Sequence, residues 1–222
     1  MPSNEITRVL EIIRILKENY PEARVSLDHK SPFQLLIATI LAAQSTDKKI
    51  NEITPALFKK YPTPEAFATS DPAELEQDIH ASGFFRQKAR SIIEASQDIV
   101  NEFGGELPDS MEGLVSLRGV GRKTANVVLG AAFNKPAMIV DTHVLRIAGR
   151  LALVDPILSE KKEAEKVEAA LMKIVPEEDW TQFSNILVHF GRDICNAKKP
   201  RHEQCPILHL CPTGKAALNI IE

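Results

Sequence analysis

Three cysteines and a histidine near the C-terminus have the residue types and the spacing of a metal site. Cys195, His202, Cys205 and Cys211 are separated by six, two and five residues, and the 222-residue chain has no further cysteine. An odd set of thiols cannot pair completely as disulfides. The charged, helix-patterned first twenty residues do not resemble a secretion signal, so we expect a reducing, intracellular compartment in which these residues bind a metal or a cluster.

A second chemical feature is a lysine that follows two closely spaced glycines. Gly119 and Gly121 lie between two helical patterns and predict a hairpin whose backbone amides, with the first turn of the next helix, can bind a phosphate. Lys123 falls in that first turn, where the helix terminus and the neighbouring Arg122 both disfavour a protonated amine. We therefore expect Lys123 to act as a nucleophile that forms a Schiff base.

The glycine turn by itself does not identify a ligand. Gly119-Val120-Gly121 lacks the third glycine of a dinucleotide fingerprint, and Arg122 stands where a P-loop needs glycine. A simple connection between two helices is the alternative interpretation.

Asp141 is the first carboxylate after Lys123 in the sequence, and it has two possible roles. It opens a helical pattern in IVDTHVLRIAGR, so its side chain can accept hydrogen bonds from the first backbone amides as an N-cap. Alternatively, it faces Lys123 as a catalytic carboxylate.

The elements that position these residues are predicted to be helices. Apolar residues recur with helical period in residues 6–16, 33–43, 50–58, 90–103, 124–133, 144–153, 163–174 and 183–190, and turn residues separate these segments. Only residues 137–140 are typical of a strand. The pattern predicts an all-α protein with enough apolar residues, 44%, for a core, and no apolar run is long enough to span a membrane.

The net charge of −3 is unevenly distributed along the chain. Residues 61–85 and 151–191 together carry −9, which leaves +6 on the remainder. A protein that binds phosphates needs a local cationic surface rather than a basic total. Ordinary solvated helix faces are the alternative explanation of this pattern.

Several ordered motifs resemble endonuclease III, the helix-hairpin-helix DNA glycosylase family of base excision repair. They are LIATILAAQSTD at 36–47, SGFFRQKARSI at 82–92, LRGVGRKTANVV at 117–128, VDTHV at 140–144 and the C-terminal cysteines. The resemblance covers nearly the whole chain. It implies a two-lobed fold, with a helical-barrel domain that contains the hairpin at 25–135 and a cluster domain formed by 1–24 and 136–222.

The resemblance also implies a reaction and a partner. The expected protein is a bifunctional DNA glycosylase and abasic-site lyase that acts on double-stranded DNA containing oxidised pyrimidines or abasic sites, with Lys123 and Asp141 as catalytic residues. A monofunctional mismatch or uracil glycosylase is disfavoured by Lys123, and a non-catalytic helix-hairpin-helix module would not need it. We further expect a cytoplasmic, nucleoid-associated monomer with no membrane contact.

The resemblance assigns DNA contacts to residues outside the catalytic pair. Gln44 aligns with a glutamine that fills the space of the extruded base, and Phe84 with an aliphatic wedge, although Gln44 could be merely polar at a helix end and Phe84 or Phe85 could be core. The remaining expected contacts are Gly119, Val120, Gly121, Arg122, Lys198, Lys199 and Arg201. The family tends to have serine at Ala42 and proline at Arg118, which leaves fine specificity open.

The cysteine spacing matches the four-cysteine pattern that holds a [4Fe-4S] cluster in this family, except that His202 replaces the second cysteine. We expect Cys195, His202, Cys205 and Cys211 to bind such a cluster, which would pin the loop at 196–201. The alternatives are a cluster with another or no fourth ligand, zinc, or no metal. His209 is off the pattern.

Overall fold

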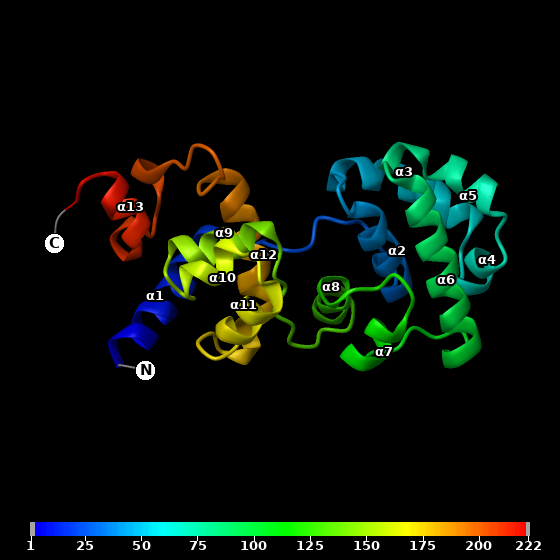
Figure 1. Ribbon diagram of the computed structural model, residues 1–222, viewed down its shortest axis with the longest axis horizontal. Helices are drawn as coiled ribbons and strands as arrows, with labels where there is room; N and C mark the ends of the chain where they lie inside the picture. Colours follow the sequence, from blue (N-terminus) through cyan, green and yellow to red (C-terminus); the bar gives the residue numbers. More distant parts are fainter. Residues whose placement is uncertain (1–2, 221–222) are drawn as a thin grey trace. The chain divides into compact units, whose positions relative to one another are not determined.

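The structure, a computed structural model, describes residues 3–220 and is built from helices joined by short loops. The chain divides into two compact units. One combines residues 3–24 with 136–220, and the other comprises residues 25–135 (Figure 1). No strand occurs in the described part of the chain, so the fold is all-α as the sequence predicts.

The unit of residues 25–135 contains the hairpin. Its elements are α2 (Pro32–Ala42), α3 (Asp47–Lys60), α4 (Pro64–Ala68), α5 (Pro72–Asp78), the short 3-10 helix η1 (His80–Ser82), α6 (Phe85–Phe103), α7 (Met111–Ser116) and α8 (Arg122–Ala132).

Three of these helices begin with a capping residue followed by proline. Ser31, Thr63 and Asp71 each accept a hydrogen bond from a backbone amide in the first turn of α2, α4 and α5, respectively. Proline at the next position fits because its fixed φ suits a helix and its missing N–H would have no helical partner there. These dipeptides therefore set where the chain starts each helix.

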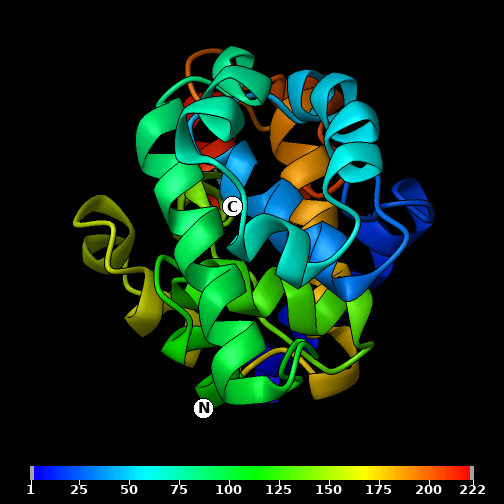
Figure 2. The same cartoon turned by 90° about the vertical axis from the view of Figure 1, so that its right-hand side faces the viewer.

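α2 is the central helix of this unit. Eight of its eleven residues are buried, as expected for a helix that is apolar on all sides. It packs against α3, α6 and α8, while α4 and α5 pack along α6, the long helix of the unit (Figure 2). The hairpin helix α8 therefore packs directly on the central helix α2.

The second unit contains the cysteines. Its elements are α1 (Ser3–Asn19), α9 (Thr142–Arg150), α10 (Pro156–Glu160), α11 (Ala164–Leu171), η2 (Glu177–Asp179), α12 (Trp180–Asp193), η3 (His202–Gln204), η4 (Leu208–Leu210) and α13 (Pro212–Ala217). α12 packs against α1 and α9, and Phe183 and Phe190 are among its fully buried side chains. The apolar core continues from these helices to Ile207 and Cys211 in the cysteine segment.

The expected strand at 137–140 is wrong, although all four of its side chains are buried. The N–H of Ala137 donates to Oγ1 of Thr181 at 3.1 Å, and that of Ile139 donates to Oγ of Ser184 at 2.9 Å. Hydroxyl groups of α12 thus satisfy the backbone of this segment in place of a neighbouring strand. Burial explains the β-like composition without a sheet.

Candidate functional site

The hairpin between α7 and α8 has the geometry that its two glycines predict. Gly119 has a φ of +79°, and a Cβ at this position would lie 2.7 Å from Cβ of Ser91, so both conformation and space require glycine. Gly121 is the N-cap of α8, and a Cβ there would meet no atom within 4 Å. Among the described residues, no side chain caps α8, so its positive end faces open space that an anion can enter.

Arg118 anchors the hairpin to α6. The backbone N–H of Arg118 donates to Oδ2 of Asp98 at 2.8 Å, and its guanidinium donates to the same carboxylate through Nε at 2.9 Å and Nη2 at 2.7 Å. These hydrogen bonds hold the pKa of the buried Asp98 below its ordinary value, although burial alone would raise it. Arg118 therefore has a structural role at a position where the resemblance leads one to expect proline.

Lys123 is an exposed residue in the first turn of α8, two positions after Gly121. Its helix is held in place by buried residues that include Ala125, Val127 and Val128. Lys123 is thus accessible from solvent beside the glycine turn. This is the placement that a nucleophile for a sugar carbon next to a phosphate requires.

Asp141 belongs to the other unit and is half-buried at the start of α9. Its Oδ1 accepts hydrogen bonds from the N–H groups of His143 at 2.8 Å and Val144 at 2.9 Å, so the N-cap role is confirmed. Both bonds end on one carboxylate oxygen, which leaves Oδ2 outside the cap. The pairing of Asp141 with Lys123 stays a prediction because the two residues lie in different units.

Gln44 and Phe84 occupy two tight turns in the unit of residues 25–135. Gln44 is exposed with a φ of +54° between α2 and α3, and Phe84 has a φ of +48° immediately before α6. Phe84 is 63% exposed, so it is not a core residue. Phe85 is half-buried, and its ring lies 4.4 Å from that of His80, centroid to centroid.

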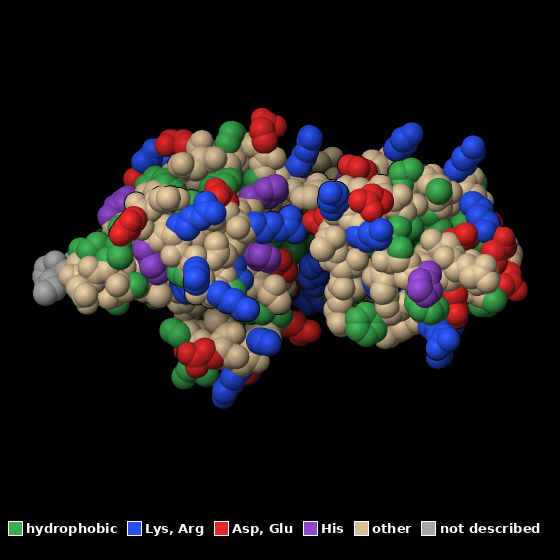
Figure 3. Space-filling model, turned by 90° about the horizontal axis from the view of Figure 1, so that it is seen from above, with side chains coloured by type: hydrophobic (Ala, Val, Ile, Leu, Met, Phe, Trp, Pro, Cys, Tyr) green, Lys and Arg blue, Asp and Glu red, His purple; other side chains and the backbone are tan. Residues whose placement is uncertain are grey.

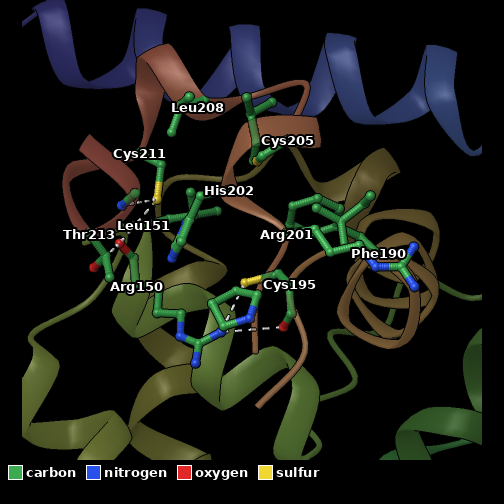
Figure 4. Close-up of a pocket in the computed structure, with 14 residues that line it drawn as sticks. Arg150, Leu151, Phe190, Cys195, Arg201, His202, Cys205, Leu208, Cys211 and Thr213 are labelled. Carbon is green, nitrogen blue, oxygen red and sulfur yellow. Dashed lines mark hydrogen bonds between the residues drawn. The ribbon is translucent and has the colours of Figure 1, made fainter. Parts of the chain in front are cut away.

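Cys195, His202, Cys205 and Cys211 line one small hollow in the second unit (Figure 4). The sulfurs receive hydrogen bonds, from Nη1 of Arg150 to Cys195 and from the N–H of Gly214 to Cys211, both at 3.3 Å. Burial raises the pKa of Cys205 to about 11 and also raises the pKa of Cys211. In residues 3–220, no three His, Cys, Asp or Glu side chains have the geometry of a metal-ion site.

His202 and His209 are distinguished by where they lie. A methyl group placed at Gly214 would lie 3.3 Å from Nδ1 of His202 and 3.5 Å from Sγ of Cys211, so both atoms approach the same point. His209 is exposed and lines a different hollow, together with Arg8 and Lys215. The donor set at the cysteine hollow, three thiols and one imidazole, fits an iron-sulfur cluster or zinc in its chemistry.

The loop before His202 carries exposed cations. Lys198, Lys199 and Arg201 are all exposed, and Arg201 lies 3.6 Å from the carboxylate of Asp193. On the face shown in Figure 3, Lys and Arg side chains are present on both units with acidic side chains among them. Cationic groups are thus available on a protein whose net charge is negative.

Two groups of supporting residues were not expected from the sequence. Lys88 is buried, with its ammonium bound to two backbone carbonyls, and Asp98 is the hairpin anchor. Arg146 and Arg150 of α9 donate to carbonyls of the segment that starts at Cys195. Lys88 and Asp98 could have been noticed in the sequence, because each is a charged residue on the apolar face of the helix α6.

Comparison with known proteins agrees with this fold and hairpin. Residues 37–177 match the family model of the HhH-GPD superfamily base excision DNA repair proteins. Endonuclease III of Synechocystis sp. is 49% identical over 95% of this chain and 94% of its own length, and that of Bacillus subtilis is 44% identical over 88% of each. A trapped endonuclease III-DNA covalent intermediate superimposes with a TM-score of 0.90 at 40% identity, covering 96% of this chain and 98% of that one.

These likenesses define a helix-hairpin-helix protein of base excision DNA repair. Its identity to endonuclease III over most of both chains defines the family within this class. The chain belongs to the endonuclease III family of DNA glycosylase/lyases. An iron-sulfur cluster is typical of this family. Among residues 3–220, no helix is long and apolar enough to cross a membrane.

Proposed function

We propose that this protein removes oxidised pyrimidines from double-stranded DNA and then cleaves the abasic site through a Schiff base on Lys123. The observation that carries the proposal is the exposed Lys123 in the first turn of α8, two residues after the glycine cap of an anion-binding hairpin. A phosphate bound at the hairpin would bring the adjoining sugar to the amine. The related endonuclease III, trapped as a covalent intermediate with DNA, supports a covalent route.

The chemistry of a primary amine accounts for both activities. Nζ of Lys123 forms a bond to C1′ as the bond between C1′ and the damaged base breaks, and the base leaves with the bonding electron pair and takes up a proton. Opening of the sugar ring gives a protonated imine, which acidifies the C2′ hydrogen. Loss of that proton expels the 3′ phosphate oxygen by β-elimination, and water then hydrolyses the imine to release the lysine.

Asp141 supplies the negative charge that this reaction needs. Positive charge develops on the sugar while the base leaves, and a carboxylate stabilises it. Oδ1 of Asp141 is engaged by two backbone amides of α9, which fixes the orientation of the carboxylate. Oδ2 is the oxygen that we assign to the sugar.

Contacts with the duplex follow from the turns and loops. We assign phosphate binding to the amides of Gly119, Val120, Gly121 and Arg122 and to the side chains of Lys198, Lys199 and Arg201. The exposed turn residues Gln44 and Phe84 are assigned to the space left by the extruded nucleotide. The partner is therefore a damaged or abasic duplex, and we propose that the protein acts on it as a cytoplasmic, nucleoid-associated monomer.

Cys195, His202, Cys205 and Cys211 are proposed as the ligands of a [4Fe-4S] cluster. Their side chains line one hollow, and His202 rather than His209 approaches it. When bound, the cluster would serve as a structural crosslink between the end of α12 and α13. The loop at 196–201 lies between two of these ligands, so its cations would be held in place for phosphates.

A duplex with one thymine glycol tests the proposal under single-turnover conditions. Alkali treatment of the sample reports base removal, and the untreated sample reports strand cleavage by the protein itself. We expect cleavage without alkali in wild type and its loss in Lys123→Gln, with the affinity for undamaged duplex retained. Cleavage that appears only after alkali would indicate a monofunctional glycosylase, and binding without either product would indicate a non-catalytic module.

A further inference from the structure

The buried ammonium of Lys88 connects the two turns that carry Gln44 and Phe84. Nζ donates to the carbonyl of Leu41 at 2.7 Å and to the carbonyl of Ser82 at 2.8 Å. Lys88 is 5% exposed, Leu41 is fully buried and Ser82 is 2% exposed. One side chain in the second turn of α6 therefore binds two segments that lie more than forty residues apart in the sequence.

Each of the two carbonyls lies at the end of a helix, just before a turn. Leu41 belongs to the last turn of α2, and Ser82 is the last residue of η1. Carbonyl groups at helix ends have no partner within the helix, and the negative end of the helix dipole favours a cation. The two carbonyls thereby accept from two of the three donors of the ammonium.

The turns that follow have strained backbones. Gln44 lies three residues after Leu41 and Phe84 two residues after Ser82, and both are non-glycine residues with positive φ, +54° and +48°. Such conformations persist only where the surrounding structure determines them, and they are typical of functional sites. The two hydrogen bonds from Lys88 tie the residues just before the two turns to one ammonium.

We propose that Lys88 is a positioning residue that sets the spacing of Gln44 and Phe84 for joint entry into the damaged duplex. This inference rests on the proposed function, because it assigns the two side chains to DNA. Lys88 itself does not contact the substrate. Its effect should therefore appear in extrusion of the base and not in the later elimination at an abasic site.

The first test replaces Lys88 with methionine, which keeps the length and apolar volume of the side chain but removes the donors. This change leaves the carbonyls of Leu41 and Ser82 without their donor and lowers stability, so the assays are run at a temperature at which the variant is folded. Lys59→Met is the matched control, because Lys59 is exposed at the end of α3 in the same unit. The substrate is a duplex with one thymine glycol and a neighbouring 2-aminopurine, whose fluorescence rises when the base is extruded.

In Lys88→Met we expect single-turnover base removal to fall on the order of 10-fold to 100-fold, as for a displacement of about 1 Å in a positioned group. The fluorescence rise should shrink, while cleavage of a pre-formed abasic site and affinity for undamaged duplex stay within about 2-fold of wild type. Lys59→Met should match wild type in every assay. Unchanged base removal and fluorescence in folded Lys88→Met would overturn the proposal.

A double-mutant cycle separates positioning from a general loss of stability. With Lys88 present, the loss of base removal in the double variant Gln44→Ala/Phe84→Ala should differ from the sum of the two single losses, because the two turns are joined. With Lys88→Met, the two losses should be additive. Coupling of equal size in both backgrounds would contradict the role of Lys88. An inactive wild type would instead refute the proposed function.

Lys88→Gln provides a second variant if Lys88→Met does not fold. Its shorter amide cannot reach both carbonyls, so we expect the same selective loss of base extrusion. If neither variant folds, Lys88 is a requirement of the fold and the proposal is wrong.

Discussion

Removal of the charge at Asp98 should loosen the hairpin by a measurable amount. Asp98→Asn retains an oxygen for the N–H of Arg118 but loses the paired bonds to its guanidinium, at 2.9 and 2.7 Å. A fully buried ion pair would lose about 3–5 kcal/mol on such a change. Because the side chain of Arg118 is 50% exposed, solvent screens the pair, and we expect a loss of about 1 kcal/mol.

Asp98→Ala should be the more damaging change. It also leaves the N–H of Arg118 without its acceptor, which adds roughly 1–3 kcal/mol. In a protein of this size, each kcal/mol corresponds to about 2–4 °C in Tm. Thermal unfolding at pH 7, with the exposed Asp28→Asn as control, measures the series. Equal Tm values for wild type and Asp98→Ala would refute the anchoring role.

The dependence on pH gives an independent check. The bonds from Arg118 hold the folded pKa of Asp98 below its ordinary value of 3.8. Since the folded pKa is the lower one, the stabilisation is complete above the unfolded value and is lost as the pH falls through the folded value. The stability difference between wild type and Asp98→Asn should be constant from pH 8 to about 4.5 and decrease below that. A difference that disappears by about pH 6 would contradict this reasoning.

The remaining predictions concern the hairpin glycines, Asp141 and the cluster. Gly121→Val should fold normally, because its Cβ meets no atom, but titration should show weaker binding to damaged and undamaged duplexes alike. Gly119→Ala should instead lower Tm, because φ is +79° and Ser91 is too close. Asp141→Asn keeps the cap oxygen, so Tm should hold while base removal falls on the order of 10²–10³-fold, with a smaller loss on a pre-formed abasic site. His202→Ala should lose bound iron or folded yield, and His209→Ala should lose neither; stoichiometric zinc without iron in wild type would contradict the cluster assignment.

The helical periodicity was sufficient to predict the fold class and the long helices. It did not reveal short helices such as α4 and α5, which are too short to show a period and are instead marked by the capping residue and proline that precede them. The strand predicted at 137–140 was wrong because the apolar side chains of this segment reflect burial and not pairing in a sheet. Composition alone does not distinguish these two causes.

The candidate site was predictable where a residue type is tied to its chemistry. Lys123, Gly119 and the cysteine spacing could be singled out because nucleophiles, positive-φ turns and metal ligands each restrict the residue type. Lys88 and Asp98 could not be assigned roles, because no sequence pattern indicates their partners. Lys88 binds the carbonyls of Leu41 and Ser82, and Asp98 binds the backbone and the guanidinium of Arg118. Only the packing of α6 against its neighbours brings these groups together.

The identity of the residue that becomes attached to DNA tests the central claim most directly. Wild-type protein and a duplex with one abasic site are treated with borohydride, which reduces the imine to a stable bond, and the digested complex is mapped by mass spectrometry. We predict that the sugar remnant is found on the peptide that contains Lys123, with no covalent product in Lys123→Gln. Attachment at another amine, or an undiminished covalent product in Lys123→Gln, would contradict the assignment.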